Sequence, residues 1–362
     1  MVASSVAQAF AAEVRALRHQ ALQGMGRTDY WHLRAIEASG HGFFAAGLAA
    51  CYWGWLLPAA LSMAVALMVR WLLMHHICHG GYDRLAGIPR RYHSSRYAMG
   101  WRRHLDWNDW ILPEAWKHEH NLLHHGFTGE EADPDLVERN LDWLAAARWP
   151  RALKLLVLAL FACTWKFSYY AARTLSCQKG QQVLDFGNFW DLRGRTQRRL
   201  WFGLFLPYVL CSFVLPAVLL EALSSGFGQQ YLACRALAEA LHNLHTFVLI
   251  VPNHAGADLH RFETVPVAER GGAAFFVRQV LGSANYRTGS EWLDFSQMYL
   301  NYQIEHHLMP QLSLLAYRRV QPLVQAACLR HGLPYVQESV GRRFVKMVQI
   351  AIGSRQMIRS GS

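Results

Sequence analysis

The sequence predicts an all-α integral membrane protein with about four transmembrane helices, arranged in two hairpins, and a helical cap on the cytoplasmic side. Three observations predict this class. Of the 362 residues, 17% are charged and 52% are hydrophobic, whereas soluble domains usually carry about a quarter charged residues. Apolar runs long enough to cross a bilayer recur along the chain. The 19 histidines gather largely in clusters beside these runs.

The positive charge of the chain does not indicate nucleic-acid binding. The net charge is +11, but the basic residues are scattered among Trp and His between apolar runs. This distribution is typical of loops that face an anionic cytoplasmic leaflet. We therefore expect the lipid bilayer, and no nucleic acid, as a partner.

The first apolar run covers residues 43–73 and contains Gly54 and Pro58 near its middle. As a single helix rising ~1.5 Å per residue it would be roughly 46 Å long. That length is too great for one span and too small for two, because one span needs about 20 residues. The run therefore predicts a tight hairpin that begins near Ile36, turns around Gly54 to Pro58 and occupies residues 36–75.

A second hairpin is predicted over residues 200–252. The runs 200–220 and 231–251 are each about one span long, and the link between them contains no Lys or Arg. We expect this link to face away from the cytoplasm. The segments 70–151 and 173–199 are rich in Arg, so the positive-inside rule places them on the cytoplasmic side.

The remaining apolar segment, residues 153–172, is flanked by basic stretches and carries Lys154 and Lys166. If it spanned the membrane, one basic flank would lie outside. We interpret it as an interfacial helix, with a fifth span as the alternative.

No repeat or linker divides the chain, so we expect a single membrane domain over residues 1–362. Its parts would be a cytoplasmic N-terminal segment (1–35), the hairpins 36–75 and 200–252, and a cytoplasmic cap (76–199 and 253–362).

Three histidine clusters lie at the cytoplasmic ends of the predicted spans, and one further histidine follows the last span. They are His75, His76 and His79; His118, His120, His124 and His125; His306 and His307, one turn after Gln303; and, alone, His254. Histidines four residues apart project from one face of a helix, where two imidazoles reach one metal ion. His125 would point round the helix by about 100° and could reach a neighbouring ion.

These clusters predict a di-metal site in the cap. Eight or so histidines are too many for one ion with about four to six ligands, so we expect two ions. Imidazole suits Zn, Cu, Fe and Ni alike, and the ligand type does not choose the metal.

The order of the clusters resembles the three histidine boxes of the membrane fatty-acid desaturases. The resemblance runs from about Arg70 to about Tyr335. It rests on His-Asn-Leu-Leu-His-His at 120–125, followed by Asp-Pro-Asp at 133–135, and on Asn-Tyr-Gln-Ile-Glu-His-His-Leu-Met-Pro at 301–310. The third box opens with Gln303 and is most similar to that of the front-end and bacterial acyl-lipid or acyl-CoA desaturases.

The resemblance implies a non-haem centre of two iron ions. Its ligands would be His75, His79, His120, His124, His125, His254, His306 and His307. Gln303 stands where many relatives have a ninth histidine and would bind metal weakly or through a water.

The chain departs from the family pattern at three places. His76 could ligate instead of His75. The second box has an additional His118 and three residues, rather than two, before its histidine pair. His260 competes weakly with His254 for the isolated ligand position.

The resemblance implies an O2-dependent fatty acyl desaturase that introduces a C=C bond into a long acyl chain linked to lipid, CoA or a carrier. An unactivated methylene has no acidity for a general base to use, so a redox metal must remove the hydrogen. We expect no catalytic residues beyond the metal ligands. Four carboxylates could orient ligand N–H groups, although each could also be a solvated loop acid: Glu119, Asp133, Asp135 and Glu305.

Electrons are expected from a separate ferredoxin- or cytochrome-type donor. The acyl chain would occupy a tunnel between the spans and the cap, on the cytoplasmic side of the membrane, which in a bacterium is the inner membrane. Seven tryptophans could line it, although an interfacial aromatic belt explains most of them: Trp101, Trp107, Trp110, Trp116, Trp143, Trp149 and Trp190.

Two alternative functions remain. The same site could serve a membrane di-iron hydroxylase or acetylenase that acts on a lipid-like substrate. A histidine-rich zinc hydrolase or receptor would need one ion and about three histidines, which leaves the other clusters unexplained.

Overall fold

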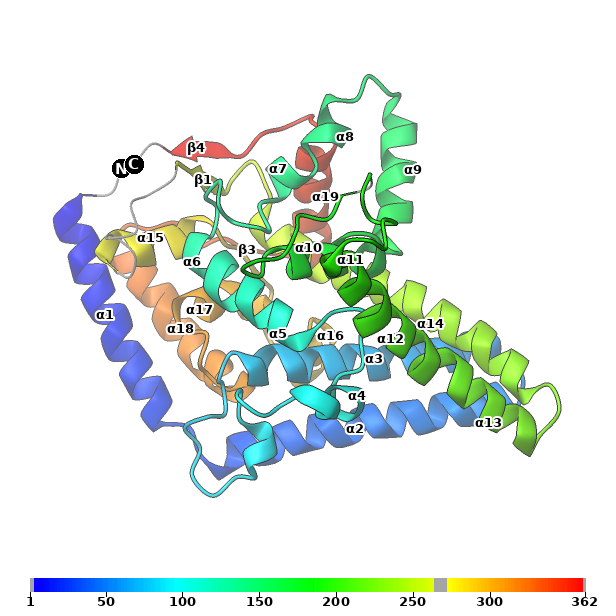
Figure 1. Cartoon of the computed structure of the whole chain (residues 1–362). Helices are drawn as coiled ribbons and strands as arrows, with labels where there is room; N and C mark the ends of the chain where they lie inside the picture. Colours follow the sequence, from blue (N-terminus) through cyan, green and yellow to red (C-terminus); the bar gives the residue numbers. More distant parts are fainter. Residues whose placement is uncertain (1–2, 186, 264–271, 361–362) are drawn as a thin grey trace.

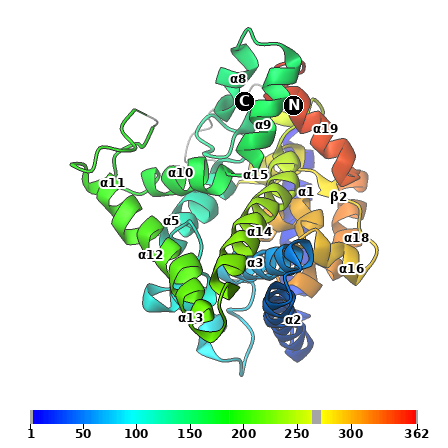
Figure 2. The same cartoon turned by 90° about the vertical axis from the view of Figure 1, so that its right-hand side faces the viewer.

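Two antiparallel helical hairpins form the apolar part of the computed structural model, which describes residues 3–185, 187–263 and 272–360 (Figure 1). The first pairs α2 (Arg27–Tyr52) with α3 (Leu56–Cys78), and the second pairs a helix over Arg195–Leu223 with α14 (Phe227–Ile250). Gly54 and Gly226 adopt positive φ angles of 74° and 79° in the two turns, a conformation that glycine adopts without steric cost. Because α14 also packs against α3, the hairpins meet along α3 (Figure 2).

Two of the described helices are long and apolar enough to cross a membrane, namely α3 and the helix Arg195–Leu223. A third span results if the bent pair Arg151–Ala162 and Lys166–Ser176 is counted as one. The partner helices α2 and α14 have 26 and 24 residues but carry charged side chains that lower their hydropathy. Both expected hairpins are therefore present, and length and hydropathy support crossing by one helix of each.

The helix α2 begins at Arg27, before the expected start of the hairpin at residue 36. The Asp29 carboxylate accepts a hydrogen bond from the Gly26 N–H at 2.9 Å, which stabilises this start. Arg319 of α18 (Leu314–Arg330) donates to the same carboxylate at 2.8 Å. The first turn of α2 is therefore tied to the cap.

Small residues let α2 and α3 approach closely. A Cβ atom on Gly40 would lie 2.7 Å from Cγ1 of Val69, and one on Gly47 would lie 2.8 Å from Cγ of Met63. In the membrane, helices associate largely through such close packing. These glycines therefore fix the separation of the first hairpin.

Two prolines, Pro207 and Pro216, interrupt the hydrogen bonds of the helix Arg195–Leu223 without ending it. It runs through α11 (Arg195–Leu200), η5 (Trp201–Phe205), α12 (Leu206–Val209), η6 (Leu210–Val214) and α13 (Leu215–Leu223), with π-helical turns at η5 and η6. A proline leaves the carbonyl four residues earlier without a donor. Arg103 donates to the carbonyl of Gly203 at 2.6 Å, and the Tyr231 hydroxyl donates to that of Ser212 at 2.8 Å. Both freed carbonyls are thus satisfied.

Residues 153–172 do not form the single helix that we expected. The structure divides them between α9 (Arg151–Ala162) and a second helix, bent by 79°, that comprises η4 (Lys166–Tyr170) and α10 (Ala171–Ser176). The Trp165 indole donates to the carbonyl of Asn243, and Lys166 pairs with Asp109 at 2.7 Å. These buried polar contacts turn the second helix toward the core.

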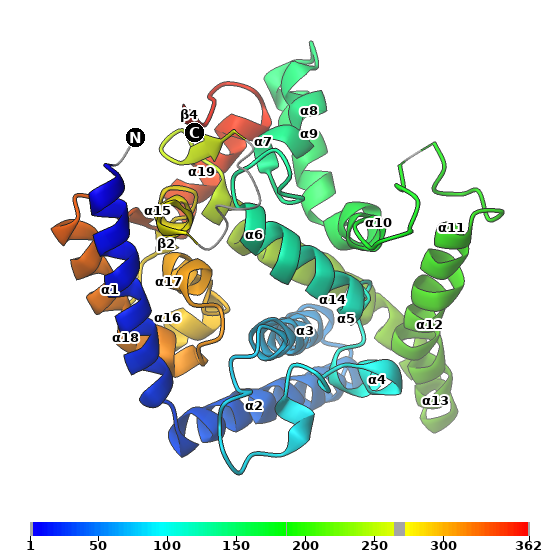
Figure 3. The same ribbon diagram turned by 60° about the vertical axis from the view of Figure 1, so that its left-hand side comes forward.

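The cap is built from shorter elements around the cytoplasmic-side ends that we predicted for the hairpins. The N-terminal helix α1 packs against α15 and α18 (Figure 3). The further elements are α1 (Ser4–Gln23), η1 (Arg90–Tyr92), η2 (Gly100–Arg102), α4 (Arg103–Asp106), α5 (Pro113–Trp116), η3 (Lys117–His124), α6 (His125–Phe127), α7 (Val137–Asn140), α8 (Asp142–Ala146), η7 (Val251–His254), α15 (Ala273–Leu281), α16 (Glu291–Ser296), η9 (Leu300–Tyr302), α17 (Gln303–Leu308) and α19 (Val340–Ala351).

Among the residues that the structure describes, four short strands supplement the predicted all-α fold. The strand β1 (His260–Phe262) pairs in parallel with β4 (Ile358–Ser360), and β2 (Asn285–Tyr286) pairs in parallel with β3 (Gln337–Glu338). Both pairs join the C-terminal part of the cap to the segment that follows α14. The structure is mostly helical, as expected.

We predict that Gly40→Ala destabilises the protein. The added methyl group must displace Val69, and overpacking of this kind costs about 1–3 kcal/mol. Thermal unfolding in detergent should show a lower midpoint for this variant. Gly42→Ala is the matched control, because a Cβ atom at Gly42 meets nothing within 4 Å; equal midpoints for the two variants would contradict the packing argument.

Candidate metal centre

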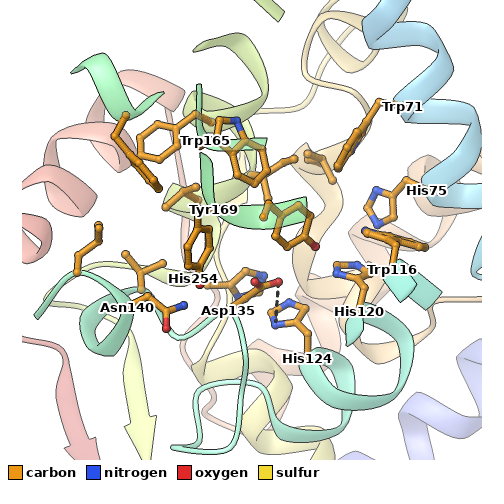
Figure 4. A pocket seen from close by; sticks show the side chains of 18 of the residues that line it. Trp71, His75, Trp116, His120, His124, Asp135, Asn140, Trp165, Tyr169 and His254 are labelled. Carbon is orange, nitrogen blue, oxygen red and sulfur yellow. Dashed lines mark ion pairs between the residues drawn. The ribbon is translucent and has the colours of Figure 1, made fainter. Parts of the chain in front are cut away.

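Four segments that lie far apart in the sequence bring the predicted histidines together. They are the C-terminal end of α3, the π-helix η3 with the start of α6, the turn η7 after α14, and α17. Figure 4 shows His75, His120 and His124 along one side of a pocket, with Trp165 and Tyr169 across from them.

The second histidine cluster lies on a π-helix, which changes the directions of its side chains. The backbone N–H of His125 donates to the carbonyl of His120, five residues earlier, so each turn holds more residues than in an α-helix. The ring of His125 lies 5.0 Å from that of His120 and 4.6 Å from that of His79. The ring of His125 therefore lies among those of its neighbours, where it could reach a neighbouring ion.

The first group of candidate ligands comprises His75, His79, His120 and His306. One ring nitrogen from each lies within 4.8 Å of the others. The Nε2 atoms of His75 and His306 are 3.2 Å apart. Two nitrogens that bind one ion at ~2.1 Å each are about 3 to 3.5 Å apart, so the pair His75 and His306 has the spacing that a shared metal ion requires.

The second group comprises His124, His254 and His307, which meet the same distance limit. The Nε2 atoms of His254 and His307 are 3.1 Å apart. Between the groups lies His125, whose ring stacks on that of His307 at 4.3 Å and lies 4.8 Å from that of His306. All eight predicted histidines are thus together, in an arrangement suited to two ions.

Several ring nitrogens at the centre have no protein partner. Both nitrogens of His120 and of His125, and Nε2 of His79, are buried without a hydrogen-bond partner among the described residues. An unpaired buried polar atom costs about 1–3 kcal/mol. A metal ion would satisfy these atoms, because neutral imidazole nitrogens are common metal ligands. The residues present therefore fit a bound metal.

Outer hydrogen bonds orient four of the rings. His124 Nδ1–H donates to Asp133 Oδ1 at 2.9 Å, that of His254 to the Gly282 carbonyl at 3.1 Å, that of His306 to the Tyr317 hydroxyl at 3.1 Å, and that of His307 to Gln279 Oε1 at 3.0 Å. A partner on Nδ1 fixes the tautomer and leaves Nε2 free to bind metal.

Burial keeps most of these imidazoles neutral. It lowers the pKa of His79, His120 and His125 well below the usual value, and charge on the neighbouring histidines would lower it further. Burial is also the largest single influence on His124, but the charge and hydrogen bond of Asp133, together with the charge of Asp135, raise the pKa of this ring above its usual value. Neutral imidazole is the form that binds metal.

The structure separates Gln303, His76 and His118, whose roles the sequence left open. The Gln303 side-chain nitrogen lies 2.9 Å from Nε2 of His254, at the edge of the second group. His76 turns away, with Nε2 3.3 Å from the carbonyl of Met298. His118 is half-buried and belongs to neither group.

The four candidate orienting acids occupy different surroundings. Asp133 binds His124 directly, and Asp135 Oδ2 lies 3.9 Å from the same ring nitrogen. Glu119 accepts from the Tyr170 hydroxyl at 3.0 Å. Glu305 accepts from Asn285 and Tyr335, both at 2.8 Å, and burial raises its pKa to about 7. Asp133 therefore has the geometry of an orienting acid, whereas the contacts of Glu119 and Glu305 tie neighbouring segments together.

An apolar pocket opens onto the histidines. Its wall includes the candidate ligands His75, His120, His124 and His254, together with Gln303. Much of the remaining wall is aromatic: Trp71, Trp116, Trp143, Phe161, Trp165 and Phe247. The pocket can therefore hold an apolar group against the candidate metal ligands.

Two of the seven tryptophans considered for a tunnel, Trp116 and Trp143, line this pocket. Trp143 is 50% exposed, so the pocket reaches the surface beside α8. Trp101 and Trp190 are largely exposed and do not line it.

Sequence reasoning did not find Gln279 and Tyr317, which hold His307 and His306, nor the pocket residues Trp71 and Trp165. Each is a single residue far in sequence from the histidine it serves or from the other pocket walls. No local spacing could have singled them out.

Fold and site together define a membrane-associated protein with a histidine centre that could hold metal and an apolar pocket beside it. The fatty acid desaturase family model matches residues 15–339. The chain belongs to this family, as the histidine boxes led us to expect, and is an oxidoreductase of the desaturase type.

Named relatives agree with this assignment. An NADPH-dependent stearoyl-CoA 9-desaturase of Mycobacterium tuberculosis is 26% identical over 345 residues, which cover 91% of this chain and 75% of the relative. An acyl-lipid (7-3)-desaturase of Diacronema lutheri is 25% identical over 93% of this chain and 72% of its own length. A shorter match, to a Delta(8)-fatty-acid desaturase of Borago officinalis, is 34% identical over 83 residues, which cover 23% of this chain and 17% of the relative.

We predict opposite results for the two adjacent histidines of the first box. His75→Ala should lower desaturation by more than about 100-fold, since the loss of an outer partner alone typically costs 10–100-fold. His76→Ala should retain most activity, because that ring faces a backbone carbonyl. The comparison needs turnover and bound metal for both purified variants; loss of metal in His76→Ala but not in His75→Ala would reverse the assignment.

Proposed function

We propose that this chain is an O2-dependent, non-haem di-iron fatty acyl desaturase that introduces a C=C bond into a long acyl chain carried by lipid, CoA or a carrier protein. The observation that carries the proposal is the pair of adjacent histidine groups at one wall of an aromatic pocket. Family membership and the named desaturases support it.

The histidines would divide between two ions. His75, His79, His120 and His306 would hold one iron, His124, His254 and His307 the other, and His125 would lie between them. When bound, the iron pair supplies the reduction of O2 and the oxidising power that removes hydrogen from an unactivated methylene. Imidazole accepts several metals, so the redox requirement of the reaction, rather than the ligand set, selects iron.

The protein residues position the substrate and keep water away. The aromatic wall formed by Trp71, Trp165 and Phe247 would hold the acyl chain by burial of apolar surface, with its reacting carbons against His120 and His124. Close, fixed placement of the reacting carbons replaces a bimolecular encounter. The depth to which the chain enters then sets the position of the double bond.

Gln303 would act at the second group as a weak ligand or by holding a water. Its amide lies beside His254 and lines the pocket. The Asn253 side chain donates to its oxygen at 3.3 Å, which fixes the amide so that its nitrogen faces the histidine.

We further propose that the two hairpins make four spans and that the cap, with the histidines, lies on the cytoplasmic side. The spans would occupy residues 36–75 and 200–252 of a single membrane domain, and the cap residues 76–199 and 253–362. The loops on the cap side are rich in Lys and Arg, whereas the link at 221–230 contains neither, and this distribution follows the positive-inside rule. In a bacterium this membrane would be the inner one.

Electrons would come from a separate ferredoxin- or cytochrome-type donor. The net charge of +11 favours association with an acidic partner, because complementary charge speeds encounter.

We expect a host of known lipid composition that expresses the chain to accumulate acyl chains with one additional double bond. His307→Ala should abolish this product while the protein still inserts, because the variant loses a candidate ligand and leaves the spans intact. Mass spectrometry of the host lipids measures the product of the wild-type chain and its loss in His307→Ala. His93→Ala is the control and should be nearly silent, since His93 belongs to neither histidine group. A product that has gained oxygen instead of losing hydrogen would contradict the proposal.

The topology predicts which engineered cysteines react with a membrane-impermeant thiol reagent added outside. In a background without native cysteines, Ser225→Cys in the turn before α14 should be labelled. Ser290→Cys before α16 should stay unlabelled until the membrane is opened, although both serines are exposed in the structure. Efficient external labelling at position 290 would overturn the four-span arrangement.

A further inference from the structure

Arg343 is a buried arginine on α19, outside the part of the chain that matches the family. The match ends at residue 339, and α19 begins at Val340. The Arg343 side chain is 0% exposed, whereas its neighbour Arg342 is exposed. Removing a guanidinium from water is costly unless its donors are satisfied, so its contacts indicate its role.

The hydrogen bonds of the Arg343 guanidinium go to one short segment, residues 252–258, and the guanidinium also forms an ion pair with Glu338 at 3.5 Å. It donates to both carboxylate oxygens of Asp258 at 2.7 and 2.8 Å, to the carbonyl of Ala255 at 2.9 Å and to the carbonyl of Pro252 at 3.3 Å. The two carbonyls lie on either side of His254 in the sequence. A single planar group therefore holds the backbone before and after a candidate metal ligand.

This segment needs donors because the helix before it ends there. The helix α14 ends at Ile250 and is followed by the 3-10 turn η7, and the last carbonyls of a helix have no partner within it. Gly256 lets the arginine approach, since a Cβ atom there would lie 2.7 Å from a guanidinium nitrogen. The carbonyls of Pro252 and Ala255 lie beyond the end of α14, and Arg343 donates a hydrogen bond to each.

The ring of His254 is fixed from its other side. Its Nδ1–H donates to the carbonyl of Gly282, and its Nε2 lies 3.1 Å from that of His307. With the ring held at Nδ1 and the backbone held by Arg343, the Nε2 atom has one position. A shift of the turn would move this atom away from His307 and His124.

We propose that Arg343 is a positioning residue for the second histidine group, which holds the turn 252–258 so that His254 can bind its ion. The inference rests on the proposed function, in which His254 is a ligand. The first group lies on α3, η3 and α17, whereas the hydrogen bonds of Arg343 go to the segment after α14. Loss of Arg343 should therefore lower the binding affinity for one ion and leave that for the other unchanged.

The test is an anaerobic titration of purified, metal-depleted full-length protein with Fe²⁺. Wild-type protein should bind two ions. Arg343→Met should bind the first with unchanged affinity and the second about 10–100-fold more weakly, the usual effect of losing an outer partner of a ligand. Because His254 is still present, excess Fe²⁺ should restore desaturation in Arg343→Met and should not restore it in His254→Ala.

Two further variants serve as controls. Lys346 lies one turn further along α19 and also binds Asp258, at 2.8 Å. The variant Lys346→Met should bind both Fe²⁺ ions with wild-type affinity. Arg343→Lys keeps the charge but lacks the planar set of donors that reaches Asp258 and two carbonyls together, so it should restore part of the second affinity.

The outcomes separate this inference from the proposed function. Fewer than two Fe²⁺ ions bound to wild-type protein would contradict the proposed function itself. If wild type binds two ions and Arg343→Met binds both with unchanged affinity, the role of Arg343 alone is overturned. The same holds if Arg343→Met binds both ions equally more weakly. If Arg343→Met does not fold, Asp258→Asn removes the carboxylate that anchors the arginine. This variant should bind the second Fe²⁺ ion more weakly and the first as wild type does. An unchanged affinity for the second ion would also overturn the inference.

Discussion

Burial of imidazole rings whose nitrogens lack partners in the described part of the chain is the constraint on which the rest of the structure depends. Five such nitrogens belong to His79, His120 and His125, and each would cost free energy in a protein core without a ligand. Helices from four parts of the chain must therefore hold the rings at metal-binding separation while the surrounding core resists collapse. The close α2–α3 hairpin, with Gly40 and Gly47 at its contact, provides a rigid base for His75 and His79.

Each histidine segment reaches this arrangement by a different local means. The π-helix of η3 places side chains four and five residues after His120 on one face. The end of α14 breaks into a 3-10 turn that frees His254 from the helix. The aromatic pocket opens onto the same rings, so an apolar chain held there would lie against the candidate ligands. The pocket wall also includes Trp143 of α8, Phe161 of α9 and Tyr169 of η4, so substrate placement would depend on more segments than metal binding does.

The sequence was sufficient for the hairpins and for the eight clustered histidines, because apolar run length, turn glycines and four-residue spacing act locally. It could not predict the π-helix that carries the second histidine cluster, since the π-helical hydrogen bond does not follow from residue spacing. Nor could it separate Asp133, which binds His124, from Glu119, which binds Tyr170, because tertiary packing decides each contact. The bend after α9 depends on Asn243, a residue distant in sequence. Gln279, Tyr317 and Arg343 act alone and leave no local pattern.

The most direct test of a di-iron centre is the metal content of the purified, catalytically active protein, measured by mass spectrometry against protein concentration. Two histidine groups of three and four rings, with His125 between them, predict two iron ions per chain. One zinc ion per chain, with full activity and no iron, would contradict the account.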